Sequence, residues 1–388
     1  MLILLKSTLV IQMLLYERHE TILYDLVIQN QLSASSGSSE VIHIIMGNES
    51  CDLDSVVSAL CLGLLQDGPD KIVIPLLNIP YDEFALRTEV TFLLRKNDIP
   101  VQLLVFRDQI DLAALCASGR LRLTLVDHHV LPERDRALTA AVEAVLDHRP
   151  LDEAASRALP AAAHRDVRIV GSCASLVAER ILEQAPQLLD AQVAQLIRGT
   201  VLLDTGCFSV QADRTTPLDV AAVEACENVC STEDRTSTFD QIVGARKDIS
   251  SLTSFQILHK DMKVVRGVPL PGMPLLVQDF LQRPDAGSAL SEFCTKHAST
   301  AAVVIGMSFS ESTSSRPSTL RRDLAVYSHC GAEQPAGQLI AALRAEDGLQ
   351  LSPLPCAVPG VTLFDQLNAK PSRKQILPVV QRVLDASA

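Results

Sequence analysis

The chain has 388 residues, 47% of them hydrophobic and 21% charged, which is the composition of a folded globular protein and excludes a disordered one. Because this length exceeds what one ordinary hydrophobic core holds, we expect two domains. The formal net charge of −12 argues against binding of a nucleic-acid duplex through positive potential, and a polyanionic substrate would need metal ions or a local basic cluster to attract it.

The ten cysteines are scattered along the chain without the spacing of a zinc site. Even the closest pair, Cys226 and Cys230, is better interpreted as two positions on one helix face. Free thiols of this kind favour a reducing compartment, so we expect a cytoplasmic protein.

Residues 1–40 differ from the rest of the chain. Their first part, "MLILLKSTLVIQMLL", is apolar but is interrupted by Lys6 and Gln12, and it is shorter than the roughly 20 residues that a bilayer span needs. We interpret residues 1–40 as an N-terminal extension with a flexible serine-rich joint at 33–39, and we expect no membrane partner. A signal peptide, an extra helix and an alternative start stay open for this segment.

From residue 41 the chain alternates between apolar runs typical of strands and amphipathic runs typical of helices. Strands are expected at 41–47, 71–79, 101–106, 121–129 and 142–150, and helices at 52–65, 82–96 and 111–118, with an alanine-rich helix before the last strand. This alternation predicts βαβ units, hence an α/β fold in which helices cover both faces of a parallel sheet.

The second half of the chain begins with a Gly-Ser turn and helix at 170–184 and a helix-to-loop segment that ends in Asp204. A polar, turn-rich region follows, and we predict a linker at 226–250 between a first domain at 41–225 and a smaller α/β domain at 251–388. Buried segments of the smaller domain are expected at 273–281, 300–310 and 324–330.

Acidic side chains gather at the predicted strand ends, where ligands bind in parallel α/β sheets. The candidates are Asp52, Asp54, Asp127, the Asp147–His148 pair and Asp204. Hard carboxylate oxygens with one imidazole suit a pair of divalent cations. No Gly-rich phosphate loop and no nucleophile elbow accompany them.

Other interpretations exist for these acids taken singly. Asp52 and Asp54 are also what the N-terminus of a helix favours, and Asp204 with the following Thr-Gly is compatible with a turn. Asp108 follows a strand as well, and we interpret it as the N-cap of the next helix. The order of the acids along the chain, rather than any one of them, favours the metal site.

The motifs "GNESCDLDS", "LVDHH", "LDHRP", "VGSCAS" and "LLDT", in this order, resemble the DHH phosphoesterase superfamily. They are most similar to the prune-type exopolyphosphatases, which are related to family II inorganic pyrophosphatases. "LHKDMK" and "SRKQILP" resemble the two basic elements of the C-terminal DHH-associated domain. The resemblance implies a metal-binding catalytic domain, a substrate-binding C-terminal domain and an active site in the cleft between them.

The resemblance also implies a role for each site residue. Two divalent cations, Mg²⁺ or Mn²⁺, would activate a water for attack on a terminal phosphorus. The implied metal ligands are Asp52, Asp54, Asp127, His148 and Asp204, with Asp147 orienting its neighbours. The implied catalytic residues are Asp127, Asp204, His148 and Arg149. The implied substrate-binding residues are Asn48, His128, Arg149, Lys263, Arg373 and Lys374.

Two departures from the pyrophosphatase pattern affect the substrate. Asn48 stands where those enzymes have a histidine, which leaves a harder, oxygen-rich site that favours Mg²⁺. Arg149 replaces the last histidine of the Asp-His-His motif and adds a fixed charge suited to a phosphate chain. We therefore expect hydrolysis of short-chain polyphosphate. Pyrophosphatase activity, (cyclic) nucleotide phosphodiesterase activity and a regulatory scaffold with protein partners and weak catalysis stay open.

Overall fold

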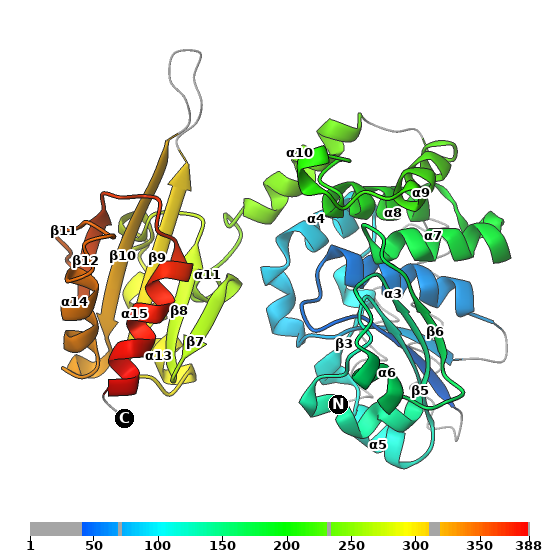
Figure 1. Ribbon diagram of the computed structural model, residues 1–388, viewed down its shortest axis with the longest axis horizontal. Helices are drawn as coiled ribbons and strands as arrows, with labels where there is room; N and C mark the ends of the chain where they lie inside the picture. The colour runs from blue at the N-terminus through cyan, green and yellow to red at the C-terminus, as the bar shows by residue number, and fades with distance from the viewer. Residues whose placement is uncertain (1–40, 69–71, 231–233, 310–318, 387–388) are drawn as a thin grey trace. The chain divides into compact units, whose positions relative to one another are not determined.

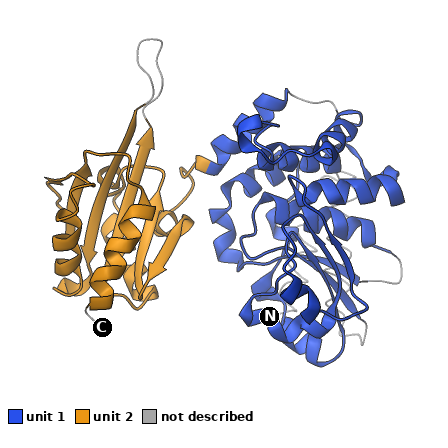
Figure 2. Ribbon diagram, in the orientation of Figure 1, with its two compact units in different colours: residues 1–246 blue, residues 247–388 orange. Residues whose placement is uncertain are grey.

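The computed structural model describes residues 41–68, 72–230, 234–309 and 319–386, so the predicted N-terminal extension lies outside the described residues. The chain divides into two compact units, Met1–Arg246 and Lys247–Ala388 (Figure 2). Each unit has its own six-stranded sheet and its own hydrophobic core.

The sheet of the first unit is parallel throughout, with strand order β3-β2-β1-β4-β5-β6, and its edge strands β3 and β6 are labelled in Figure 1. The strands are β1 (Ile42–Met46), β2 (Ile72–Leu77), β3 (Val105–Phe106), β4 (Leu121–Val126), β5 (Val142–Asp147) and β6 (His164–Val167). The order reverses direction between β1 and β4. This is a topological switch point, where the loops after two adjacent strands diverge and leave room for a ligand.

Helices cover both faces of this sheet, as the sequence predicts. They are α3 (Leu53–Gln66), α4 (Thr88–Lys96), α5 (Leu112–Ala117), α6 (Glu153–Ala158), α7 (Cys173–Gln184), α8 (Ala191–Asp204), α9 (Pro217–Glu227) and α10 (Arg235–Lys247). Adjacent residues of β1 show the two faces. Ile45 belongs to the core built with α3, α7 and α8, whereas Ile44 belongs to a second core built with α5. Both faces are apolar because side chains alternate along a strand and both sides are covered.

Several local predictions differ from the structure. The helix expected at 82–96 is a 3₁₀ segment (Tyr81–Leu86) followed by α4, and the alanine-rich helix is also 3₁₀ (Glu133–Ala141). Asp111, not Asp108, caps α5, because a 3₁₀ turn (Arg107–Gln109) separates the strand from the helix. Edge strand β6 lacks the apolar run that marks a buried strand, and its residues are half-buried or exposed.

The second unit contains a mixed sheet of order β11-β12-β10-β9-β8-β7, in which only β8 and β9 are paired in parallel. Its strands are β7 (Met262–Val265), β8 (Val268–Met273), β9 (Ala301–Phe309), β10 (Leu320–Ser328), β11 (Leu351–Leu354) and β12 (Val361–Gln366). Its helices are α11 (Ser254–Lys260), α12 (Val277–Phe280), α13 (Ala286–Lys296), α14 (Ala336–Arg344) and α15 (Arg373–Ala386). Helices α14 and α15 share a core with the sheet, which makes this a smaller α/β unit.

The junction between the units differs from the predicted linker at 226–250. Most of that segment is α10, whose Ile242 is fully buried in the core of the first unit, with Phe239 and Val243 packed beside it. The division falls between Arg246 and Lys247, at the end of α10. A few apolar side chains anchor a helix that is otherwise polar, so composition alone suggests a linker. Across the described ranges, no helix is both long and apolar enough to span a bilayer.

Candidate metal centre

Asp127 lies directly after β4 with φ at 60°, in the left-handed region that non-glycine residues rarely adopt. Its N–H donates to the carbonyl of Leu146 on β5 at 2.9 Å, and its side chain is fully buried. The Asn48 amide and the Ser55 hydroxyl donate to Oδ2 at 2.6 and 2.7 Å. One carboxylate oxygen is thus held by the segment that follows β1, and the other, Oδ1, is available to groups from β5.

Asp54 lies in the first turn of α3 and is buried. Its Oδ2 accepts the N–H of Cys173 at 2.7 Å, and its Oδ1 accepts the N–H of Ala174 at 2.8 Å and the hydroxyl of Ser58 at 3.1 Å. The first two donors belong to the first turn of α7, where backbone N–H groups lack partners within the helix and the dipole favours negative charge. Both carboxyl oxygens of Asp54 are therefore held against the N-terminus of a second helix.

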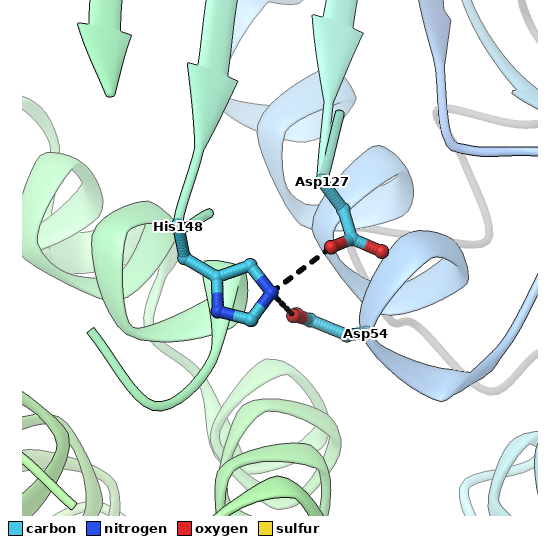
Figure 3. A group of neighbouring side chains, drawn as sticks. All are labelled: Asp54, Asp127 and His148. Carbon is cyan, nitrogen blue, oxygen red and sulfur yellow. Dashed lines mark ion pairs between the residues drawn. The ribbon is translucent and has the colours of Figure 1, made fainter. Parts of the chain in front are cut away.

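His148 follows β5 and completes the cluster, as Figure 3 shows. Its Nδ1 lies 3.1 Å from the carbonyl of Val170, which can only accept, so Nδ1 carries the proton. Its Nε2 lies 3.2 Å from Oδ1 of Asp127 and 3.6 Å from Oδ2 of Asp54. The backbone N–H of His148 donates to Oδ1 of Asp147 at 2.7 Å. A histidine whose Nδ1–H is bound to a carbonyl presents Nε2 as a ligand, which is the usual orientation around metals.

The charges of the cluster are out of balance. Burial raises the pKa of Asp127 to about 7, and the charge of Asp54 adds to this rise. Burial likewise raises the pKa of Asp54, and it raises that of Asp204 well above the usual range, with further increases from neighbouring carboxylates. For His148, burial opposes the charged form, but the bond to Asp127 and the charge of Asp54 outweigh it and raise the pKa to about 9. Buried carboxylates in excess of cations are what a divalent ion would neutralise.

The donor set fits a metal ion. Ligand atoms of Asp54, Asp127 and His148 all lie within 4.8 Å of one another, and this is the one such group within the described ranges. Two carboxylate oxygens and one imidazole nitrogen suit Mn²⁺ and Mg²⁺, which prefer oxygen ligands. The sequence predicted these three side chains from three separate segments, and the structure brings them together.

Asp52 and Asp204 stand outside that group of three. Asp52 is the N-cap of α3, and its Oδ1 accepts the N–H of Ser55 at 3.2 Å. This is the capping role that the sequence analysis gave as the alternative to metal binding. Asp204 is the last residue of α8, and its Oδ2 accepts the hydroxyl of Ser172 at 2.7 Å. The charges of Asp52 and Asp54 nonetheless raise the pKa of Asp204, so these acids act on one another electrostatically.

The side chain of Asn48 supports Asp127. Besides its bond to that carboxylate, its Oδ1 accepts the N–H and the hydroxyl of Ser50 at 2.8 and 2.5 Å. Arg149 also contacts the cluster, with Nη2 3.1 Å from Oδ1 of Asp127. Its side chain is 46% exposed, so a ligand in solvent can reach the rest of the guanidinium.

The two histidines that follow Asp127 have different surroundings. His128 is buried and donates Nδ1–H to the carbonyl of Val126 at 2.9 Å, while its buried Nε2 has no partner among the described residues. His129 accepts the N–H of Asp152 on Nε2 at 2.7 Å and donates Nδ1–H to Asp147. His129 therefore connects the two strand ends and holds Asp147. The sequence did not predict this role, because the order of residues alone does not show which of the two adjacent histidines contacts Asp147.

The predicted basic residues of the second unit lie around its β7 edge. Lys263 is exposed on β7, and Lys374 is exposed in the first turn of α15. The guanidinium of Arg373 donates to the carbonyl and the carboxylate of Asp261, at 2.8 and 2.6 Å, and lies 3.4 Å from the carbonyl of Leu270. Arg373 thus joins α15 to β8 and to Asp261, the residue between α11 and β7. Lys263 pairs with Leu270.

The parallel sheet, the cluster at its carboxyl ends and the mixed-sheet second unit define a two-domain phosphoesterase of the DHH class. Residues 240–383 match the model of the DHHA2 domain. The chain is 39% identical to "Exopolyphosphatase PRUNE1" of Mus musculus over 363 residues, which are 91% of this chain and 78% of that protein. It is 37% identical to the Homo sapiens protein of that name, with the same coverage.

More distant matches were also found. A "Putative exopolyphosphatase" of Schizosaccharomyces pombe is 29% identical over 90% of this chain and 93% of that protein. The crystal structure of a Methanococcus jannaschii putative family II inorganic pyrophosphatase aligns with a TM-score of 0.45 and 16% identity over 89% of this chain and all of that chain. On the strength of the PRUNE1 relatives, the chain belongs to the prune family of exopolyphosphatases.

Proposed function

We propose that this chain is a metal-dependent phosphoanhydride hydrolase that removes terminal phosphate from short-chain inorganic polyphosphate. The observation that carries the proposal is the convergence of Asp54, Asp127 and His148 at the switch point of the parallel sheet. Ligand atoms this close, with pKa values displaced by burial and by one another's charge, are typical of functional rather than structural groups. The exopolyphosphatase names of the relatives supply the substrate class.

The three converging side chains would hold one divalent cation, and Asp52 and Asp204 would extend the site to a second. Asp204 supports this extension, since its charge is already coupled to those of Asp52, Asp54 and Asp127. When bound, a pair of Mg²⁺ or Mn²⁺ ions supplies an acidified water and neutralises charge on the phosphoryl oxygens.

The protein's own groups would bind and orient the substrate. Arg149 can bind phosphoryl oxygens with the exposed part of its guanidinium while Nη2 remains bonded to Asp127. This would fix how the end of the polyphosphate approaches the site. The buried Nε2 of His128 is an unsatisfied acceptor, suited to a protonated phosphate oxygen or a water. The basic side chains Lys263, Arg373 and Lys374 would provide positive charge for the remaining phosphates of the polyphosphate.

The free thiols of all ten cysteines fit action in a reducing compartment such as the cytosol.

Phosphate release tests the proposal. The purified chain is given pyrophosphate, tripolyphosphate, longer polyphosphate and cyclic nucleotides, with Mg²⁺, with Mn²⁺ and after chelation. We expect the highest kcat/KM on short polyphosphate and none after chelation. His148→Gln should reduce phosphate release at least about 100-fold because it removes the ligand nitrogen. His164→Gln is the matched control, an exposed histidine on the neighbouring strand, and should be neutral. Turnover of pyrophosphate alone, or turnover that survives His148→Gln, would reject the proposal.

A further inference from the structure

Asp219 is a fully buried acid in the first turn of α9, outside the motifs that define the site. Its Oδ2 accepts both the N–H and the hydroxyl of Thr216 at 2.7 Å, which forms a capping box. A capping box satisfies groups of its own helix and normally lies at the surface. Complete burial indicates that this carboxylate has partners elsewhere.

Those partners belong to the segment that begins α7. Oδ2 of Asp219 also accepts the N–H of Gly171 at 2.9 Å, and Oδ1 accepts the N–H of Ser172 at 3.3 Å and the hydroxyl of Ser175 at 2.6 Å. With the two bonds from Thr216, the carboxylate accepts from five donors. Three of these are backbone N–H groups, which cannot reverse their direction.

The segment held by Asp219 contacts the candidate metal centre directly. Residues Cys173 and Ala174 donate their N–H groups to Asp54, and the hydroxyl of Ser172 donates to Asp204. Each of these bonds starts from a residue that Asp219 holds or from the two residues next to it. Asp219 therefore reaches Asp204 through Ser172, and it reaches Asp54 through the two residues that lie between Ser172 and Ser175. The two acids lie on different helices.

Packing leaves this segment little freedom to move. A Cβ on Gly171 would lie 2.7 Å from Oδ2 of Asp219 and 2.7 Å from Cγ2 of Thr205, the residue after Asp204. Real Cβ atoms do not approach other atoms so closely, so the absence of a side chain at 171 is what lets the backbone reach the carboxylate. The carboxylate of Asp219, the segment that begins α7 and the end of α8 are therefore closely packed against one another.

We propose that Asp219 is a positioning residue for the metal centre: by fixing residues 171–175 it sets the separation and orientation of the carboxylates of Asp54 and Asp204. The inference rests on the proposed function, because it needs that centre to bind metal. The competing explanation is that Asp219 only stabilises the start of α9. The two differ in what they predict for metal affinity in a folded variant.

Asp219→Asn is the decisive variant, since it keeps shape and changes only the acceptors. Oδ1 and Oδ2 each accept at least one backbone N–H, so either orientation of the amide places its NH₂ against an N–H donor. We expect the affinity for Mn²⁺, measured calorimetrically on the metal-free chain, to fall about 10- to 100-fold, as for other groups that orient metal ligands. Raising the Mn²⁺ concentration should restore kcat. Asp190→Asn is the matched control, because Asp190 caps the other end of α8 and its carboxylate accepts the N–H of Val193 within that helix.

The outcomes separate the two claims. If the wild-type chain binds no Mn²⁺, the proposed function fails first and the inference fails with it. If the wild type binds Mn²⁺ and a folded Asp219→Asn binds it within twofold, Asp219 is a helix cap and the inference alone is overturned. If Asp219→Asn does not fold, Ser175→Ala removes one of the five bonds from a folded chain. A loss of Mn²⁺ affinity between twofold and 10-fold in Ser175→Ala then supports the inference, and unchanged affinity overturns it.

Discussion

Replacing Asp127 by asparagine should stabilise the metal-free protein and destabilise the metal-bound one. In the fold, burial raises the pKa of this carboxyl from 3.8 to about 7, so the unfolded state loses its proton first as pH rises. The raised pKa means that stability present in acid is lost between about pH 4 and pH 7. The difference of about three pH units corresponds to about 4 kcal/mol at pH 8.

The substitution removes this penalty but also disturbs hydrogen bonds. Oδ2 accepts from Asn48 and Ser55, while Oδ1 faces the guanidinium of Arg149, so the amide NH₂ meets a nitrogen donor in either orientation. A mismatch of that kind costs about 1–3 kcal/mol. The net expectation at pH 8 is a gain of about 1–3 kcal/mol for metal-free Asp127→Asn, and no gain at pH 4, where the wild-type carboxyl is already protonated.

The assay is urea unfolding of wild type and variant, at pH 4 and pH 8, in chelator and in excess Mn²⁺. The wild type should gain stability from Mn²⁺ in proportion to the logarithm of its concentration, and Asp127→Asn should gain little, so the order of stability reverses when metal is added. Asp111→Asn, which changes the exposed N-cap of α5, should show no reversal. A variant that is less stable than wild type at pH 8 in both chelator and metal would refute the charge-based reasoning.

Three further outcomes are expected. Arg149→Lys keeps the charge but loses the planar donor pair, so kcat/KM for tripolyphosphate should fall about 10-fold in steady-state assays, and an unchanged value would exclude a gripping role. Burial raises the pKa of Asp323 to about 6. The free energy of unfolding of the second unit should therefore fall by about 2 kcal/mol between pH 4 and pH 7, and Asp323→Asn should remove this pH dependence in calorimetric scans. His129→Ala removes the partner of Oδ2 of Asp147 and the partner of the N–H of Asp152, while Oδ1 of Asp147 keeps the backbone N–H of His148, and should cost about 1–3 kcal/mol in urea unfolding. A neutral effect would mean that water replaces the ring.

The parallel sheet and the positions of its acids could be predicted because both follow from local patterns. Apolar runs at intervals set by helices predict parallel strands, and parallel strands end at one edge of their sheet. Asp54, Asp127 and His148 follow β1, β4 and β5, three strands that are neighbours in the sheet. The sequence shows that these residues end strands. That the strands are adjacent follows from the topology.

Features set by contacts between distant segments could not be predicted. Edge strand β6 is recognised only by its pairing with β5, since one side has no neighbour and its residues are mostly polar. Asp219 is separated from Gly171 by 48 residues and looks in the sequence like an ordinary helix cap. Asp52 and Asp204 could not be assigned from the sequence for the same reason. Whether an acid caps a helix or binds a cation depends on the position of its carboxylate in the fold, which the order of residues does not determine.

The structure also changes what Asn48 implies. Loss of a histidine at this position would by itself remove one metal ligand, yet the asparagine amide donates to Oδ2 of Asp127 and its oxygen is used by Ser50. Asn48 therefore supports a ligand instead of acting as one. Since the donation fixes Oδ2, it leaves Oδ1 directed at His148 and Arg149. The same side chain thus orients the carboxylate on which His148 and Arg149 converge, and it adds no ligand atom of its own.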